Sequence, residues 1–157
     1  MQEKQNIGSL FNRIAPTYDF LNHLLSLNID KWWRRKAVRF LKKKSVSGQC
    51  LDVAIGTADL SIELARQLPD LTITGIDLST EMMRLGEKKV IEKGLQNRIS
   101  FHETSALDMP FADATFDVVT CGFGIRNFSD LDRGLREMIR VLKERSEEHT
   151  SELQSRS

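Results

Sequence analysis

Two carboxylates and one glycine stand at positions that could bind a nucleoside. An apolar run over residues 50–53 breaks into a small-residue turn at Gly56, and a second apolar run over residues 71–76 ends at Asp77. This pattern predicts a strand, a tight loop, a helix and a second strand. In a right-handed βαβ unit the ligand lies over the loop and its sugar meets the carboxylate at the end of the second strand. The spacing indicates a nucleoside-type cofactor, and an ordinary strand–turn–helix with a solvated Asp77 is the alternative.

The composition of the loop separates the classes of nucleoside. A dinucleotide site usually needs three glycines, so that the backbone and the helix N-terminus can approach a pyrophosphate. Here only Gly56 is present, with Ala54 and Ala58 where further glycines would stand. Asp52, on the first predicted strand, would repel a pyrophosphate and attract an ammonium group. A cofactor with a ribose at one end and a cationic amino acid at the other suits both Asp52 and Asp77, and S-adenosylmethionine is such a molecule.

The apolar patterns also predict the elements that must position these residues. Strands and helices alternate along the chain, which is typical of an α/β fold with a doubly wound parallel sheet. In the last helix we expect Leu135, Met138, Ile139 and Leu142 to face the core. The predicted strands are 49–53, 72–77, 99–103 and 116–121, and the predicted helices are 31–44, 58–68, 79–94 and 131–143.

Several motifs make the chain similar to a known family. Two of them flank the loop: Ala-Pro-x-Tyr-Asp at residues 15–19 and Phe-Gly-x-Arg-Asn at residues 123–127. With residues 51–60, 75–79 and 109–111, they resemble the bacterial menaquinone/ubiquinone C-methyltransferases, and the resemblance extends from residue 11 to about residue 143. The loop alone marks only the broad methyltransferase class, whereas the two flanking motifs are specific to the quinone branch.

The resemblance implies roles for residues around S-adenosylmethionine. Asp77 would accept hydrogen bonds from both ribose hydroxyls, a geometry that suits the two oxygens of a carboxylate. Thr57 would face the methionine part of the cofactor, for which a plain turn role is the alternative, and Asp52 would balance the ammonium. Ser105 and Ala106 match the pair that contacts adenine, but relatives usually carry Asp or Asn where Ser105 stands, so this contact is weakened.

On the acceptor side the resemblance implies Tyr18, Asp19, Arg126 and Asn127. Methylating a carbon of a demethylmenaquinol-type ring requires an electron-rich carbon, which forms when a ring hydroxyl loses its proton. A base would help, and a cation such as Arg126 could stabilise the phenolate. Methyl transfer is an in-line displacement at a sulfonium, so much of the rate would come from positioning. Helix-capping and ion-pair roles are the alternatives for these four residues.

Other functions stay open at this point. The acceptor could be a polyprenyl benzoquinol, as in ubiquinone synthesis, or the chain could be a cofactor-binding module without catalysis. Residues 31–44 contain eight basic residues and no acidic one. With Trp32, Trp33 and Phe40, this helix could rest on an anionic membrane surface, where a polyprenyl quinol resides. A solvated basic face is the alternative, and since no motif for reading nucleic acid accompanies the helix, we expect no nucleic-acid partner.

The bulk composition is that of an ordinary soluble domain, with 40% hydrophobic and 29% charged residues and a net charge of +1. Cys50 and Cys121 lie in apolar runs and read as buried thiols of a reducing compartment. Three scattered histidines have no metal-ligand spacing, so no metal site is expected. With no apolar run of membrane-spanning length and no signal-peptide pattern, we expect a cytoplasmic protein, in contact with the inner face of the membrane at most.

The chain divides into three expected regions. Residues 1–46 would form an N-terminal helical substrate or lid region, and residues 47–144 the N-terminal part of a Rossmann-like class I methyltransferase domain. Four strands are predicted where the family's sheet has seven, so its C-terminal strands are missing. Residues 145–157 lack hydrophobic periodicity and resemble the translation of a sequencing adapter, so we treat them as a non-native or disordered tail. On its own this chain is expected to be a poor enzyme.

Overall fold

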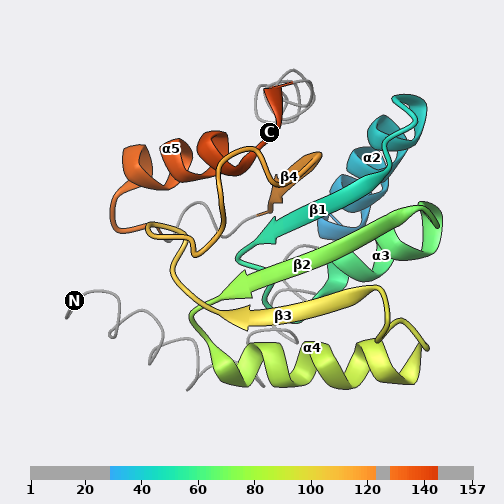
Figure 1. The fold of residues 1–157 in the computed structure, drawn as a ribbon. Coiled ribbons are helices and arrows are strands. Elements are labelled where there is room, and N and C mark those ends of the chain that lie inside the picture. The colour runs from blue at the N-terminus through green and yellow to red at the C-terminus, as the bar shows by residue number, and fades with distance from the viewer. Residues whose placement is uncertain (1–28, 123–127, 145–157) are drawn as a thin grey trace.

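A computed structural model describes residues 29–122 and 128–144 of the chain. The expected roles of Tyr18, Asp19, Arg126 and Asn127, and the expected tail over residues 145–157, lie outside these described residues. The described elements, in chain order, are α2 (Ile29–Lys43), β1 (Gly48–Val53), α3 (Asp59–Gln67), β2 (Leu71–Asp77), α4 (Thr80–Glu92), β3 (Ile99–Glu103), β4 (Val118–Cys121) and α5 (Leu131–Val141) (Figure 1).

The four described strands form one parallel sheet in the order β3-β2-β1-β4. The chain steps from β1 to β2 to β3 through α3 and α4, and then returns to the other side of β1 to form β4 (Figure 1). The strand order therefore reverses between β1 and β4. In doubly wound sheets a ligand binds at the carboxyl ends of the strands beside such a reversal. The predicted α/β class is confirmed.

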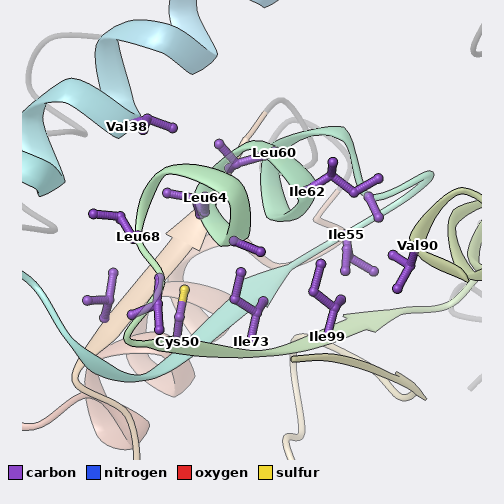
Figure 2. Packing of buried hydrophobic residues seen from close by; sticks show 14 of the residues in the cluster. Val38, Cys50, Ile55, Leu60, Ile62, Leu64, Leu68, Ile73, Val90 and Ile99 are labelled. Atoms are coloured by element: carbon purple, nitrogen blue, oxygen red, sulfur yellow. The ribbon is translucent and has the colours of Figure 1, made fainter. Parts of the chain in front are cut away.

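In β1 and β4, residues on both faces are buried, and their side chains alternate between two apolar clusters. Cys50 of β1 and Val118 of β4 pack with α2, α3 and α4, in the cluster shown in Figure 2. Leu51 and Val119, the next residue of each strand, pack with α5 on the other face. This alternation follows from the two-residue period of a strand. The cover on both faces is what a parallel sheet requires.

The last helix differs from its prediction in two ways. It ends at Val141 rather than at position 143, because Leu142 is extended and forms a parallel bridge with Phe116. Phe116 accordingly lies before β4 instead of within it. The predicted inward position of Ile139 is wrong, since its side chain is 57% exposed while Met138 is buried. Each residue of a helix turns by about 100°, so the neighbour of an inward residue can point to solvent.

Candidate cofactor site

The predicted cofactor-binding residues gather at one edge of the sheet. Val53 at the end of β1 pairs with Ile76 of β2 and with Cys121 of β4, and Asp77 of β2 pairs with Glu103 of β3. The loop over residues 54–58 leaves this edge from β1, and residues 104–106 leave it from β3. Strands and register therefore bring together residues that are far apart in the sequence.

The loop after β1 has three residues in the left-handed region. Gly56 has φ 57°, and Ala54 and Ala58 have φ 58° and 69°. The two alanines thus adopt the conformation that glycine prefers, at a cost of about 1–2 kcal/mol each. Backbone hydrogen bonds support the turn, because Ile55 N–H donates to the Ile76 carbonyl at 3.0 Å and Ala58 N–H donates to the Ile55 carbonyl at 3.0 Å.

Two glycines let this loop lie close against its neighbours. A Cβ at Gly75 of β2 would overlap the side chain of Ile55, which folds back over the strand. A Cβ at Gly56 would lie 3.0 Å from Cε of Met82 on α4. The next residue in the loop, Thr57, is buried, with 6% of its surface exposed. The loop backbone is therefore held by close packing on β2 and α4, as a rigid ligand cradle should be.

Asp77 joins the loop to the end of β2. Its Oδ2 accepts the Gly56 N–H at 2.8 Å, and its Oδ1 accepts the Ser79 N–H at 2.9 Å. Burial raises the pKa of the Asp77 carboxyl, while the N–H donors of Ser79 and Gly56 oppose the rise. Capping of α4 is carried out by Ser79, whose hydroxyl accepts the Met82 N–H at 3.2 Å. Because each carboxylate oxygen accepts more than one hydrogen bond, Asp77 can still take the two hydroxyls of a ribose.

Asp52 lies deeper, between β1, α3 and β4. Only 2% of its surface is exposed. Its Oδ2 accepts the Ser61 hydroxyl at 2.6 Å, and its Oδ1 accepts the Thr120 hydroxyl at 3.1 Å. Burial raises the pKa of Asp52 to about 6; the two hydroxyl bonds oppose the rise and the charge of Asp77 adds to it. Sequence reasoning missed Ser61 and Thr120, because the packing of α3 on the sheet places Ser61 beside Asp52 and the pairing of β4 with β1 places Thr120 there.

Ser105 and Ala106 follow β3 beside Asp77. The Thr104 N–H donates to the Asp77 carbonyl at 3.1 Å, which places this segment next to the end of β2. The Ser105 hydroxyl accepts the Leu107 N–H at 3.0 Å and so closes a turn. Ala106 packs against the α5 side of the core. The Ser105 oxygen is thus engaged within its own loop, although its O–H remains a donor that can turn toward a ligand.

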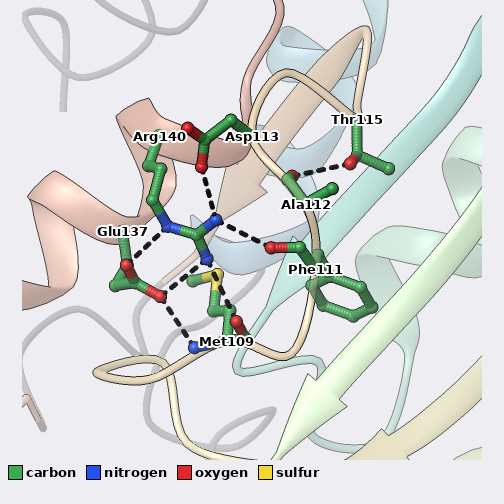
Figure 3. Close-up of polar contacts among 7 residues, drawn as sticks. All are labelled: Met109, Phe111, Ala112, Asp113, Thr115, Glu137 and Arg140. Carbon is green, nitrogen blue, oxygen red and sulfur yellow. Dashed lines mark hydrogen bonds and ion pairs between the residues drawn. The ribbon is translucent and has the colours of Figure 1, made fainter.

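An arginine of α5 fixes the loop that continues from this segment (Figure 3). Arg140 bonds to Glu137 at 2.8 Å and to Asp113 at 2.8 Å. It also donates to the carbonyls of Phe111 at 2.7 Å and Met109 at 3.0 Å. Glu137 in turn accepts the Met109 N–H at 2.7 Å. The Arg140 bonds hold the pKa of Glu137 below its usual range, and the two acidic partners raise the pKa of Arg140.

The side chains at this edge indicate a class of ligand, and the described residues form no metal-binding cluster. Within residues 29–122 and 128–144, no group of three His, Cys, Asp or Glu side chains is placed to hold a metal ion. In the same residues, every helix is too short or too polar to cross a membrane. Three groups at this edge could contact a ligand. The Asp77 carboxylate could accept hydrogen bonds from a diol, the buried Asp52 carboxylate could pair with a cation, and the closely packed Gly56 lets a ligand approach the backbone. This set fits a nucleoside with a cationic amino-acid arm better than it fits a pyrophosphate.

Comparisons with known proteins show which family the chain matches. Residues 1–154 match the profile of the ubiE/COQ5 methyltransferase family. A demethylmenaquinone methyltransferase from Porphyromonas gingivalis is 49% identical over 143 residues, which are 90% of this chain and 58% of that protein. The ubiquinone/menaquinone biosynthesis C-methyltransferase UbiE from Geotalea daltonii is 47% identical over 143 residues, or 90% of this chain and 60% of that one. The chain thus spans less than two thirds of the length of these relatives.

A solved structure supports the fold. The protein mmp1179 from Methanococcus maripaludis, which carries the name of an S-adenosyl-L-methionine-dependent methyltransferase, superposes with a TM-score of 0.75. The match covers 92% of this chain and 69% of that one at 22% identity. At such identity the likeness concerns the fold alone, so the chemistry has to be argued from the residues.

Proposed function

Since the chain belongs to the ubiE/COQ5 methyltransferase family, we propose that the whole protein transfers a methyl group from S-adenosylmethionine to a ring carbon of demethylmenaquinol. The observation that carries the proposal is the contact between the Asp77 carboxylate and the Gly56 loop. That contact joins the two features on which a nucleoside would rest. The 49% sequence identity to a demethylmenaquinone methyltransferase supports the choice of acceptor.

Each predicted cofactor residue has a defined task in this proposal. Asp77 accepts the ribose hydroxyls, and the close approach allowed by Gly56 brings the loop backbone against the ligand. Thr57 faces the methionine part, and Asp52 supplies the negative charge that balances the ammonium. Ser105 and Ala106 flank the adenine, where Ala106 offers an apolar contact and Ser105 only its O–H.

The acceptor residues act on protons and charge. When bound, the cofactor supplies an electrophilic methyl group on its sulfonium. Arg126 stabilises the negative charge that the quinol ring gains on deprotonation, which raises the electron density of the attacking carbon. Tyr18, Asp19 and Asn127 orient the ring hydroxyls and help to remove the proton. The remaining rate enhancement comes from holding the ring carbon in line with the sulfur–methyl bond.

Transfer of a labelled methyl group tests this function directly. The intact protein is given S-adenosylmethionine with an isotopically labelled methyl group and either demethylmenaquinol or a demethylated polyprenyl benzoquinol. We expect label on a ring carbon of the naphthoquinol. Label only on the benzoquinol would move the protein to ubiquinone synthesis. Cofactor binding without transfer to either quinol would favour a non-catalytic cofactor-binding module.

The substitution Arg126→Ala sharpens the assay. It should lower turnover more than it lowers affinity for the cofactor, since the residue is assigned to the acceptor. Arg126→Lys keeps the charge and should retain part of the activity. Normal turnover with a lower melting temperature would instead make Arg126 a structural ion-pair residue.

A polyprenyl acceptor resides in the membrane, so we also propose that the protein is cytoplasmic and contacts the inner face of the membrane through α2. One face of this helix is buried in the core through Ala37, Val38 and Leu41. On the remaining surface Trp32 is 60% exposed, with Lys36 Nζ 4.7 Å from its ring centroid. An exposed tryptophan among basic side chains suits an anionic interface. The exposed basic residues are Lys31, Arg35, Lys36, Arg39, Lys42, Lys43 and Lys44.

Vesicle sedimentation tests the membrane contact. The protein should sediment with vesicles that contain phosphatidylglycerol and not with pure phosphatidylcholine, and added salt should weaken binding. The double variant Arg35→Glu/Arg39→Glu should lose binding. Lys88→Glu/Lys93→Glu makes the same charge change at exposed positions of α4 and its end, and should bind normally. Binding to single-stranded RNA and not to vesicles would indicate that the basic face of α2 binds nucleic acid instead of a membrane.

A further inference from the structure

Two hydroxyls hold the buried carboxylate of Asp52 from two different elements. Ser61, in the first turns of α3, is fully buried, and Thr120 of β4 is 5% exposed and lies opposite Asp52 in the strand register. Each hydroxyl donates to a different oxygen of Asp52, at 2.6 Å and 3.1 Å. A side chain bound in this way has one orientation, because rotation would break at least one bond.

We propose that Ser61 and Thr120 are positioning residues that orient Asp52 toward the ammonium of the cofactor and hold it in its ionised form. This inference rests on the proposed cofactor and adds two residues to its site. An apolar pocket of the same shape would drive the carboxyl to its neutral form, since burial of an unpaired charge is costly. Two donated hydrogen bonds favour the carboxylate instead.

The electrostatic surroundings of Asp52 favour a cationic ligand. The titratable groups that face it are Asp77 and Cys50; the charge of Asp77 raises its pKa, and burial raises the pKa of the Cys50 thiol and keeps it neutral. Among the described residues no basic side chain forms an ion pair with Asp52. Its hydroxyl partners carry no charge, and each oxygen keeps a second acceptor position. An ammonium group would supply the positive charge that these neighbours of Asp52 lack.

The titration of Asp52 should make the affinity for an ammonium-bearing ligand depend on pH. With a pKa of about 6, Asp52 is mostly ionised at neutral pH and mostly protonated near pH 5. A ligand that needs the carboxylate should therefore lose about tenfold in affinity between about pH 7 and pH 5. Loss of either hydroxyl removes a bond that favours the charged form. The fall in affinity should then begin at a higher pH.

Two ligands that differ only in the amino-acid part isolate this effect. S-adenosylhomocysteine carries the ammonium without the sulfonium charge, and 5′-methylthioadenosine carries the nucleoside without the amino acid. We would measure both by calorimetry on the intact protein across this pH range, for the parent, Ser61→Ala and Thr120→Val. S-adenosylhomocysteine should show the tenfold fall, shifted by about one pH unit upward in each variant. Methylthioadenosine should show neither effect.

Further variants make every outcome decisive. Asp52→Asn should bind S-adenosylhomocysteine weakly and without pH dependence, and Ser61→Thr, which keeps a hydroxyl, should restore the parent profile. Unchanged profiles in Ser61→Ala and Thr120→Val would overturn the proposal and leave both residues as packing groups. Equal losses for the two ligands would do the same. If the parent binds methylthioadenosine but Asp52→Asn leaves S-adenosylhomocysteine affinity intact, the nucleoside site stands and this inference fails. If the parent binds neither ligand, the proposed function fails with it.

Discussion

The carboxyl edge of the sheet and the cluster around Arg140 both hold carboxylates, but in opposite electrostatic states. At the edge, burial raises the pKa of Asp52 and Asp77, and their partners are neutral hydroxyls and backbone N–H groups. In the cluster, the Arg140 guanidinium lowers the pKa of Glu137. The edge is therefore negatively charged without a counter-ion among these partners, while the cluster is balanced internally.

This difference is what we expect between a ligand-binding site and a structural support. A group that is already paired with a cation gains little from a ligand, and removing its partner costs stability. A buried carboxylate held only by neutral donors carries a desolvation cost that a cationic or hydroxyl-bearing ligand can offset. We therefore expect substitutions at the edge to act mainly on ligand affinity, and substitutions in the cluster to act mainly on the free energy of unfolding.

The largest expected effect is the loss of ligand affinity in Asp77→Ala. Each hydroxyl bond to this carboxylate should contribute about 1.5–3 kcal/mol, so losing two should weaken S-adenosylhomocysteine by well over a hundredfold. Calorimetry measures the loss, and circular dichroism checks that the fold is kept. Unchanged affinity for S-adenosylhomocysteine would show that Asp77 does not bind the ligand. It would also contradict the expected difference between the edge and the Arg140 cluster.

The next effect is on stability as a function of pH. Asp52 has a pKa of about 6 in the folded protein against an ordinary value of 3.8, so the folded state binds more protons between these values. Its contribution to stability is complete below the lower value and is lost as pH rises through the higher one, at most about 3 kcal/mol. Urea unfolding near pH 5 and pH 7 should show about 1.3 kcal/mol of this difference in the parent.

Asp52→Asn provides the control for that measurement. The variant should lose the pH-dependent gain that Asp52 contributes, whereas Glu137, whose pKa is lowered, loses its own contribution only at more acidic pH. Acidification should thus stabilise the protein while it weakens binding of an ammonium ligand. An identical pH slope in parent and variant would contradict the raised pKa of Asp52.

Arg140→Met should destabilise the fold by about 2 kcal/mol, since it removes the guanidinium that donates to the Met109 and Phe111 carbonyls and to the Glu137 carboxylate. Arg136→Met on the same helix is a matched control. Its ion pair with Asp132 is 78% and 73% exposed, so the cost should stay within about 0.5 kcal/mol. Urea unfolding at neutral pH compares the two. Equal costs would mean that the cluster is no more than a surface pair.

The smallest expected effect concerns the strained loop. Ala54→Gly should stabilise the protein by about 1 kcal/mol, because glycine adopts the left-handed conformation without the clash of a Cβ. Ala58→Gly relieves the same strain but removes a methyl group that is fully buried, so its net change should be near zero. Thermal unfolding distinguishes them. A loss of stability in Ala54→Gly would show that the alanine methyl packs better than its half-buried position indicates.

Local patterns in the sequence predicted many of the secondary-structure elements and their bounds. β3 has its predicted bounds of 99–103, and the small-residue turn at Gly56 was recognised from the break in an apolar run. The predicted start of the helix at residue 79 coincides with its N-cap, Ser79. These features depend on neighbours within a few residues, which is the range over which strand alternation, helix periodicity and capping act.

The tertiary structure decided the features that depend on distant neighbours. The bond between Thr120 and Asp52 spans 68 positions and exists because β4 pairs with β1. A separate bridge between Phe116 and Leu142 also joins distant positions, and the last helix ends before it, at Val141. From the sequence alone, the types and spacing of Asp52, Gly56 and Asp77 were enough to indicate the class of cofactor. The sequence did not indicate Thr120 as a partner of Asp52, because strand order sets this contact and no short-range pattern records it.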